Sequence, residues 1–315
     1  MAHFWHNLRN RFVKAYNSGY LPEQDGHQIF FREIGNPKGQ PVICFHAGPG
    51  LSSSVAQAYS YNLKKYRIII FDQRGCGLSR YKDAFKNNTL QKTIEDANRL
   101  LDFLQIKTKV IAAGCSWGST CALVFAESYP EKVKKIIVNA IFLGRKKDME
   151  CLTPVTSLFY PDMWDEIKRI AGNINPEKYF GKLLFSTKSA DQQKAMKYYE
   201  TLDYTTSAAA PSYEFKDRKC TDKEIQIFRV YMHYQLHDCF LKENQILKNA
   251  SKIKGIPTEI YQNRWDPSCP PYQAYDLHKA LPDSNLHMIP VRGHIHEEMF
   301  WRMYLDNLND YKKCR

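Results

Sequence analysis

The chain has 315 residues, of which 43% are hydrophobic and 13% aromatic, a composition that indicates a globular protein and excludes a disordered one. Lys and Arg total 45 against 33 Asp and Glu, but the excess positive charge is scattered along the chain, so nucleic acid is not an expected partner. No stretch approaches the roughly 18 apolar residues that a membrane-spanning helix needs, so a membrane is not an expected partner either.

The nine cysteines are odd in number, lie far apart and include no Cys-x-x-Cys pair. This pattern favours reduced thiols over a disulfide framework or a zinc site. We therefore expect a cytoplasmic protein without a metal or a cofactor. The sequence leaves the oligomeric state open.

The first 16 residues place Phe4, Leu8, Phe12 and Tyr16 on one helical face. We expect an amphipathic helix that packs against the body of the protein. The segment is basic and has no acidic residue, so an organelle-targeting segment is the alternative interpretation.

Short apolar stretches then alternate with helical segments, which predicts an α/β protein with a mostly parallel, doubly wound sheet. A hairpin is predicted over 20–36, around Asp25-Gly26. A helix is predicted over 89–104, and the apolar stretches typical of buried strands are 41–45, 67–71, 110–113, 135–139, 256–261 and 285–290. Sheets of this kind bind ligands at the carboxyl ends of their strands.

The alternation stops over 145–240, where the chain is polar, rich in Tyr and Lys, and helical in pattern. We expect this segment to form a helical cap over the carboxyl edge of the sheet. The predicted core then consists of residues 1–144 and 241–315.

A Gly-x-Ser-x-Gly frame, Gly114-Cys115-Ser116-Trp117-Gly118, follows the predicted strand over 110–113, and a helical pattern follows at once. A serine at a sharp strand-to-helix turn needs neighbours without a Cβ atom, because the backbones there pass closely. The amino end of the helix directs N–H groups at a carbonyl on which negative charge develops. The frame therefore predicts Ser116 as a nucleophile.

A serine hydroxyl requires a base that takes its proton and a carboxylate that orients the base. In a fold of this kind the chain order is Ser, Asp or Glu, then His. Asp266 and His294 follow the last two predicted strands in that order, so we expect them to complete a triad. Asp276 and Asp283 are the alternatives to Asp266.

Several motifs together resemble the proline iminopeptidases, or prolyl aminopeptidases, which have the α/β-hydrolase fold with an inserted helical cap. The resemblance covers nearly the whole chain, and it is carried by His46-Ala47-Gly48-Pro49-Gly50, Asp72-Gln73-Arg74-Gly75-Cys76-Gly77, Gly114-Cys115-Ser116-Trp117-Gly118 and Arg264-Trp265-Asp266. It implies Ser116 as the nucleophile, His294 as the base and Asp266 as the group that orients it. It also implies an oxyanion hole formed by the backbone N–H groups of Trp117 and Ala47. The family usually has glycine at the second of these positions, and an alanine there keeps the donor provided that its φ is negative.

The cap departs further from the family, which holds the α-amino group of its substrate with cap glutamates. The resemblance places Asp203 on the first glutamate and Gln235 on the second, and it places Phe142 in the aromatic wall around the proline ring. The expected substrate-binding residues are therefore Asp203, Gln235 and Phe142, with one carboxylate fewer than the family has.

Three functional interpretations follow. The leading one is a serine aminopeptidase that releases an N-terminal residue, with proline the expected one, from short peptides through an acyl-enzyme. The second keeps the triad in an esterase or amidase that acts on small acyl compounds. The third is a non-catalytic binding protein, against which the complete triad argues. The expected partner is a short peptide or a small molecule.

Overall fold

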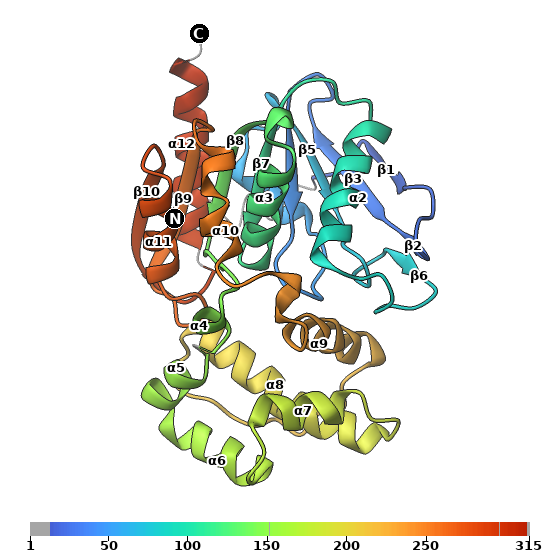
Figure 1. Cartoon of the computed structure of the whole chain (residues 1–315), viewed down its shortest axis with the longest axis vertical. Helices are drawn as coiled ribbons and strands as arrows, with labels where there is room; N and C mark the ends of the chain where they lie inside the picture. The colour runs from blue at the N-terminus through green and yellow to red at the C-terminus, as the bar shows by residue number, and fades with distance from the viewer. Residues whose placement is uncertain (1–12, 151, 296, 314–315) are drawn as a thin grey trace.

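An eight-stranded sheet forms the centre of the computed structural model, which describes residues 13–150, 152–295 and 297–313 (Figure 1). In spatial order its strands are β1 (Asn17–Tyr20), β3 (Phe30–Gly35), β5 (Tyr66–Phe71), β4 (Gln40–Phe45), β7 (Val110–Cys115), β8 (Val133–Asn139), β9 (Thr258–Trp265) and β10 (Asn285–Arg292). β3 pairs antiparallel with β1 and β5, and every later neighbour in the sheet pairs in parallel. The predicted α/β fold with a mostly parallel sheet is confirmed.

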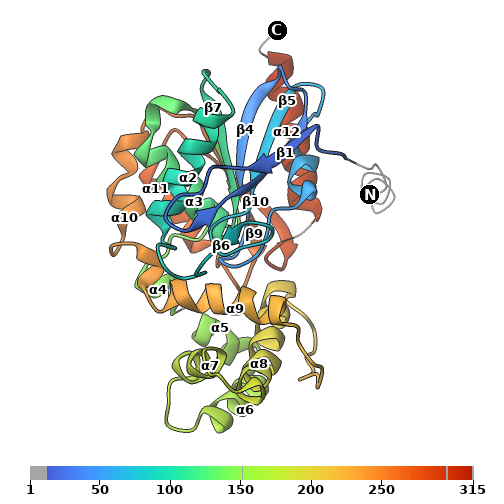
Figure 2. The ribbon, with the colours of Figure 1, turned by 90° about the vertical axis from the view of Figure 1, so that its right-hand side faces the viewer.

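Helices cover both faces of the sheet, which explains why its central strands are apolar throughout. In β4, Ile43 and Phe45 belong to one hydrophobic cluster while Val42 and Cys44 belong to the other. The first cluster includes residues of α2 (Leu90–Phe103), α3 (Trp117–Ser128), α10 (Gln245–Lys248), η4 (Ala250–Ile253) and α11 (Tyr272–Ala280). The short η2 (Pro130–Lys132) follows α3 and leads into β8. The second cluster packs against η1 (Val55–Ser60) and α12 (Glu297–Lys313), which lie on the opposite side of the sheet (Figure 2).

The predicted hairpin forms at Asp25-Gly26. Gln24 and His27 exchange backbone hydrogen bonds of 2.9 Å, and the two residues between them have φ values of 56° and 83°. These are the positive φ angles that a two-residue hairpin turn requires. The turn leads into β2 (His27–Gln28), which pairs with β6 (Arg80–Tyr81).

The helix predicted over 1–16 lies outside the described residues except for its last four. Residues 13–16 are not helical, and Tyr16 leads directly into β1, so the prediction is wrong for that part. Tyr16 instead donates a backbone hydrogen bond of 2.9 Å to Glu33, which extends the pairing of β1 with β3. Strand pairing therefore prevails over local helical periodicity at this point.

The helices that follow β8, as far as η3, form a layer beyond one end of the sheet (Figures 1 and 2). They are α4 (Lys146–Met149), α5 (Leu152–Phe159), α6 (Pro161–Ala171), α7 (Pro176–Leu184), α8 (Ser189–Ala208), α9 (Asp222–Gln235) and η3 (Asp238–Phe240). Met163, Phe180, Met196 and Ile225 belong to a third hydrophobic cluster within this layer. We call the segment from α4 to α9, including the loops between these helices, the cap; the boundaries drawn from the sequence, at 145 and 240, stay a prediction.

Within the described residues, no helix combines the length and the apolar character that crossing a membrane requires. The seven cysteines for which the structure gives a position are all free thiols.

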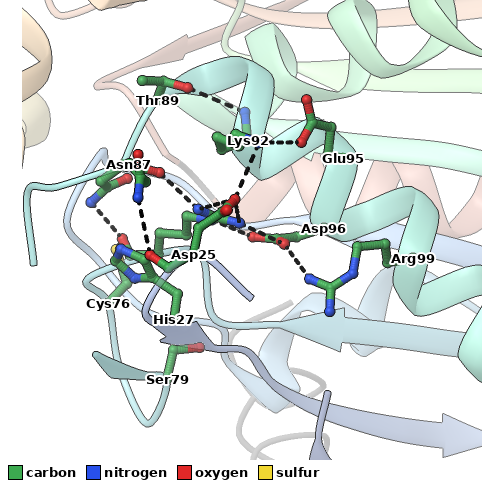
Figure 3. Close-up of polar contacts among 12 residues, drawn as sticks. Asp25, His27, Cys76, Ser79, Asn87, Thr89, Lys92, Glu95, Asp96 and Arg99 are labelled. Carbon is green, nitrogen blue, oxygen red and sulfur yellow. Dashed lines mark hydrogen bonds and ion pairs between the residues drawn. The ribbon is translucent and has the colours of Figure 1, made fainter. Parts of the chain in front are cut away.

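A buried arginine, Arg74, fixes the loop that follows β5, and its partner Asp96 is labelled in Figure 3 beside Arg99. The Arg74 guanidinium donates to both carboxylate oxygens of Asp96 on α2, at 2.6 and 3.0 Å, and to the backbone oxygen of Asn87 at 2.8 Å. The side chains of Arg74 and Asp96 are 0% and 1% exposed. Arg99 adds a second contact to Asp96, at 2.9 Å. The loop is therefore tied to a core helix by a bidentate, fully buried ion pair.

Arg74→Met should lower the free energy of unfolding by about 3–5 kcal/mol, because it leaves the Asp96 carboxylate buried without its main partner. Urea denaturation monitored by circular dichroism measures this loss. The control is Arg169→Met, which removes an ion pair with Glu166 from the surface of the cap and should change stability little. Equal losses in the two variants would contradict a supporting role for the buried pair.

Candidate active site

Ser116 lies at the apex of the turn between β7 and α3, with φ of 56° and ψ of −124°. This is a strained conformation for a residue with a side chain. Two glycines make it possible: a Cβ atom on Gly114 would lie 1.9 Å from the backbone oxygen of Gly118, and one on Gly118 would lie 2.2 Å from that of Phe45. The backbone N–H of Ser116 donates to Asn139 at 3.0 Å, which ties the turn to β8. The Gly-x-Ser-x-Gly frame therefore forms the sharp turn that the sequence predicts.

Asp266 and His294 are brought together from the ends of β9 and β10. The two side chains are joined by a hydrogen bond of 2.8 Å between His294 Nδ1 and Asp266 Oδ2. The other carboxylate oxygen accepts from the backbone N–H groups of Ser268 and Cys269, each at 2.9 Å. A proton on Nδ1 donated to the carboxylate leaves Nε2 free to accept one. Asp276, an alternative from the sequence, instead pairs with Arg145 at 2.8 Å.

The loop that carries His294 is held by the cap. The backbone N–H of His294 donates to the backbone oxygen of Ser207, in the last turn of α8, at 2.7 Å. The preceding residue, Gly293, has a φ of 87° and approaches the same oxygen so closely that a Cβ atom would lie 3.1 Å from it. We call the bond between His294 and Ser207 the α8 latch.

The two residues expected to form an oxyanion hole lie on adjoining segments. Trp117 is the first residue of α3, where backbone N–H groups have no partner within the helix. Ala47 is not among the described residues with positive φ, so the condition set for an alanine at this position is met. Beside it, His46 Nε2 accepts from the Gln73 backbone N–H at 3.0 Å and its Nδ1 lies 2.7 Å from the Ala47 oxygen.

Gln73 joins these two segments from the loop after β5. Its side-chain nitrogen donates to the His46 backbone oxygen at 3.0 Å, and its side-chain oxygen accepts from Trp117 Nε1 at 2.9 Å. All three side chains are buried, and burial lowers the pKa of His46, so a neutral imidazole is favoured in this contact. The Asp-Gln-Arg-Gly-Cys-Gly segment thus supports the site without reaching into it.

A cavity of about 610 Å³ separates the carboxyl edge of the sheet from the cap. Of the residues to which the sequence assigns a role, those that line the cavity are Ala47, Ser116, Trp117, Phe142, Asp203, Gln235 and His294. Asp266 is buried behind His294. Segments far apart in the chain therefore meet at one place.

The carboxylate of Asp203 has an unusual position. Among the described residues it has no hydrogen-bond or ion-pair partner, and it faces the cavity from α8. Desolvation by the surrounding protein raises its pKa, an effect that the charge of His294 opposes. Burial by itself lowers the pKa of His294, but the carboxylates of Asp266 and then of Asp203 raise it above its ordinary value. The two ends of the cavity are thus electrostatically coupled.

Four charged residues in the same cavity were missed by the sequence analysis, and one of them, Asp148, is paired with Arg145 at 2.6 Å. Arg218 bridges Glu200, on α8, and Glu224, in the first turn of α9, with 2.9 Å between Arg218 Nη2 and Glu224 Oε1. Together with Asp203, Arg218 and these two glutamates make three carboxylates against one guanidinium, a net charge of −2 when all are ionised. The spacing of Glu200 and Asp203, three residues apart on one helical face, was the signal available in the sequence.

Comparisons with known proteins show the family to which the chain belongs. The model of a family described as alpha/beta hydrolase fold matches residues 40–296. A proline iminopeptidase of Arabidopsis thaliana is 32% identical over 293 residues, which cover 90% of this chain and 76% of the relative. A proline iminopeptidase of Neisseria gonorrhoeae is 34% identical over 288 residues, which cover 89% of this chain and 91% of the relative.

Solved structures show the same fold at lower identity. A hydrolase from Pseudomonas aeruginosa superposes with a TM-score of 0.60 and 15% identity, covering 94% of this chain and 98% of its own. A proline iminopeptidase-related protein from Thermus thermophilus superposes with a TM-score of 0.57 and 19% identity, covering 94% and 95%.

We expect a fluorophosphonate to label the protein at Ser116, because the hydroxyl lies in one cavity with His294. His294→Ala should slow labelling by about three orders of magnitude or more, and Asp266→Asn by a similar factor, because the amide favours the wrong imidazole tautomer. Labelling rates followed by intact-protein mass spectrometry test this. Ser128→Ala, at the far end of α3, is the control and should label normally. Normal labelling of Asp266→Asn would remove Asp266 from the site.

The coupling between Asp203 and His294 predicts a shift in the pH dependence of that labelling. Only the neutral imidazole accepts the serine proton, so the rate should rise as pH increases through the pKa of His294. Asp203→Asn removes a charge that favours the imidazolium, so the midpoint should move to lower pH. Asp217→Asn, on an exposed cap residue, is the control and should leave the midpoint unchanged. An unchanged or higher midpoint in Asp203→Asn would contradict the coupling.

Proposed function

Because the chain belongs to the proline iminopeptidase family of α/β hydrolases, we propose that it is a serine aminopeptidase that releases an N-terminal residue, above all proline, from short peptides. One observation supports this more than any other. The cavity that contains Ser116 and His294 also contains the carboxylate of Asp203, which has no hydrogen-bond or ion-pair partner among the described residues. The N-terminus of a peptide carries a cationic amine close to its first carbonyl group, so it can bind the carboxylate while that carbonyl lies beside the serine. The cysteines of the sequence are scattered and include no Cys-x-x-Cys pair, a pattern that supports a cytoplasmic location for this activity.

In the proposed reaction, Ser116 attacks the carbonyl carbon of the first residue, and His294 Nε2 takes the hydroxyl proton. Asp266 holds the imidazole through Nδ1 and stabilises the imidazolium that forms. The N–H groups of Trp117 and Ala47 receive the developing oxyanion. His294 then gives its proton to the departing amine, which leaves the acyl group on Ser116. Water attacks this acyl group while His294 takes a proton from the water. His294 finally returns that proton to the serine oxygen as the acid is released.

The cap supplies the recognition of the N-terminus in this proposal. Asp203 accepts hydrogen bonds from the primary ammonium group of the N-terminus, or from the secondary ammonium of an N-terminal proline, and a bond of this charge-assisted kind is about twice as strong as a neutral one. Gln235 offers an amide oxygen on the same cavity, and Phe142 offers an aromatic face for a proline ring. Glu200 and Glu224, although paired with Arg218, add to the negative potential that attracts a cationic substrate.

An esterase or amidase that acts on small acyl compounds is the second candidate. The observation that favours it is the size of the cavity, about 610 Å³, together with a serine centre that does not itself require an amine. A non-catalytic binding protein is disfavoured by the contact between His294 and Asp266.

Hydrolysis of a prolyl arylamide and of a simple acyl ester under the same conditions tests the proposal. We expect kcat/KM for the prolyl arylamide to exceed that for arylamides of bulkier N-terminal residues, because Phe142 and the cap limit the width of the cavity. Ser116→Ala should abolish all of these activities and so exclude a contaminating enzyme. Rapid hydrolysis of the ester without hydrolysis of any arylamide would support the second candidate and contradict the first.

A further inference from the structure

A second cavity, of about 930 Å³, opens between the cap and the loop that follows β9. Its aromatic lining comes from both sides: Phe159, Tyr160, Tyr213 and Phe215 from the cap, and Trp265 from the end of β9. Pro211 and Pro267 also line it. We call this cavity the cap–loop groove. Phe159 is 72% exposed and Trp265 is 60% exposed, so the groove presents large apolar side chains to solvent.

Exposed aromatic side chains gathered in one groove indicate a binding site. Grooves lined by aromatic residues bind extended peptides well, because a peptide in the polyproline II conformation is already ordered and places side chains against flat rings. The wall of this groove is itself fixed, since Tyr160 donates a hydrogen bond of 2.9 Å to the backbone oxygen of Ala210. A preformed wall reduces the entropic cost of binding.

The groove is continuous in sequence with the active-site cavity on both of its sides. On the cap side, Ser207 and Ala208 line the active-site cavity, whereas the next two residues line the groove. On the core side, Ser268 lines the active-site cavity and the residue before it lines the groove. Only a narrow strip separates the two, and it is bridged by the hydroxyl groups of Ser207 and Ser268, 3.4 Å apart.

An aminopeptidase must find room for the part of its substrate that it leaves intact. The bond that is cut lies directly after the first residue, and each further residue of an extended chain adds about 3.3–3.6 Å. The active-site cavity is of the size that holds a small ligand, so a longer peptide must extend beyond it. The cap–loop groove begins next to the active-site cavity, at the place where such a peptide would extend out of that cavity.

We propose that the cap–loop groove binds, in extended form, the residues of a peptide substrate that follow the scissile bond, as the chain passes over the contact between Ser207 and Ser268. This inference rests on the proposed aminopeptidase function. It adds a second binding site to the enzyme. The affinity contributed by this site depends on the length of the peptide and not on its first residue.

The test compares two substrates that share an N-terminal proline. A prolyl arylamide has only the arylamine beyond the scissile bond and does not reach the groove. A fluorogenic peptide of about eight residues is long enough to reach it, because each residue of an extended chain adds about 3.3–3.6 Å. The double variant Phe159→Ser/Trp265→Ser should raise KM for the peptide about tenfold, since each serine removes an exposed aromatic surface. It should leave kcat/KM for the arylamide within about twofold.

Leu158→Ser is the matched control, because Leu158 is 75% exposed beside Phe159 but does not line the groove. It should leave both substrates unaffected. A series of peptides of increasing length gives a second measurement: KM in the wild type should fall with length and then level off, and the double variant should lose this dependence.

Equal effects of the double variant on both substrates, or no effect on the peptide, would overturn the proposal while leaving the aminopeptidase function intact. A changed oligomeric state in light scattering, with KM unaltered for both substrates, would assign the groove to contacts between copies of the chain and overturn it as well. Failure of the wild type to cleave either substrate would instead contradict the proposed function, and this inference with it.

Discussion

The site depends on one strained turn. Ser116 adopts a positive φ between β7 and α3, a conformation that costs on the order of 1–3 kcal/mol and is retained only where the surroundings enforce it. The enforcement comes from close packing, because Gly114, Gly118 and the end of β4 approach one another more closely than side chains would permit. The same approach brings Trp117 and Ala47 to one cavity with the serine. Any residue other than glycine at either position would have to push these strands apart, and the site with them.

The cap is joined to this site by more than proximity. Helix α8 carries Asp203 and, one turn later, Ser207, whose backbone oxygen holds the N–H of His294 at 2.7 Å. The residue proposed to bind the substrate amine and the residue that holds the proposed base are therefore parts of one helix. A substrate bound to Asp203 would therefore contact the same helix that holds His294 through Ser207. The α8 latch thus gives recognition and chemistry a common mechanical support.

The features that the sequence predicted are those with a local or ordered signal. The turn at Asp25-Gly26 needs only two residues that tolerate positive φ, and the strands needed only runs of apolar residues. The contact between Asp266 and His294 followed from chain order in a parallel sheet, whose carboxyl ends meet at one edge. The ion pair of Arg218 with Glu200, the α8 latch and the cap–loop groove carry no such signal. They arise where cap segments meet each other or the core, and they join residues from different elements of the chain. The helix expected at the N-terminus shows that a local signal can also mislead. Tyr16 fits a helical period, yet its backbone N–H pairs with Glu33 and extends β1.

The central claim is that one cavity joins a serine acyl-transfer centre to a carboxylate that binds the amine of the substrate. Measuring kcat/KM for a prolyl arylamide with a free and with an acetylated N-terminus, in the wild type and in Asp203→Asn, tests it most directly. We predict that acetylation lowers kcat/KM about tenfold or more in the wild type and adds little to the loss already present in Asp203→Asn, because both changes remove the same bond. Equal hydrolysis of the free and acetylated substrates by the wild-type protein would contradict the claim.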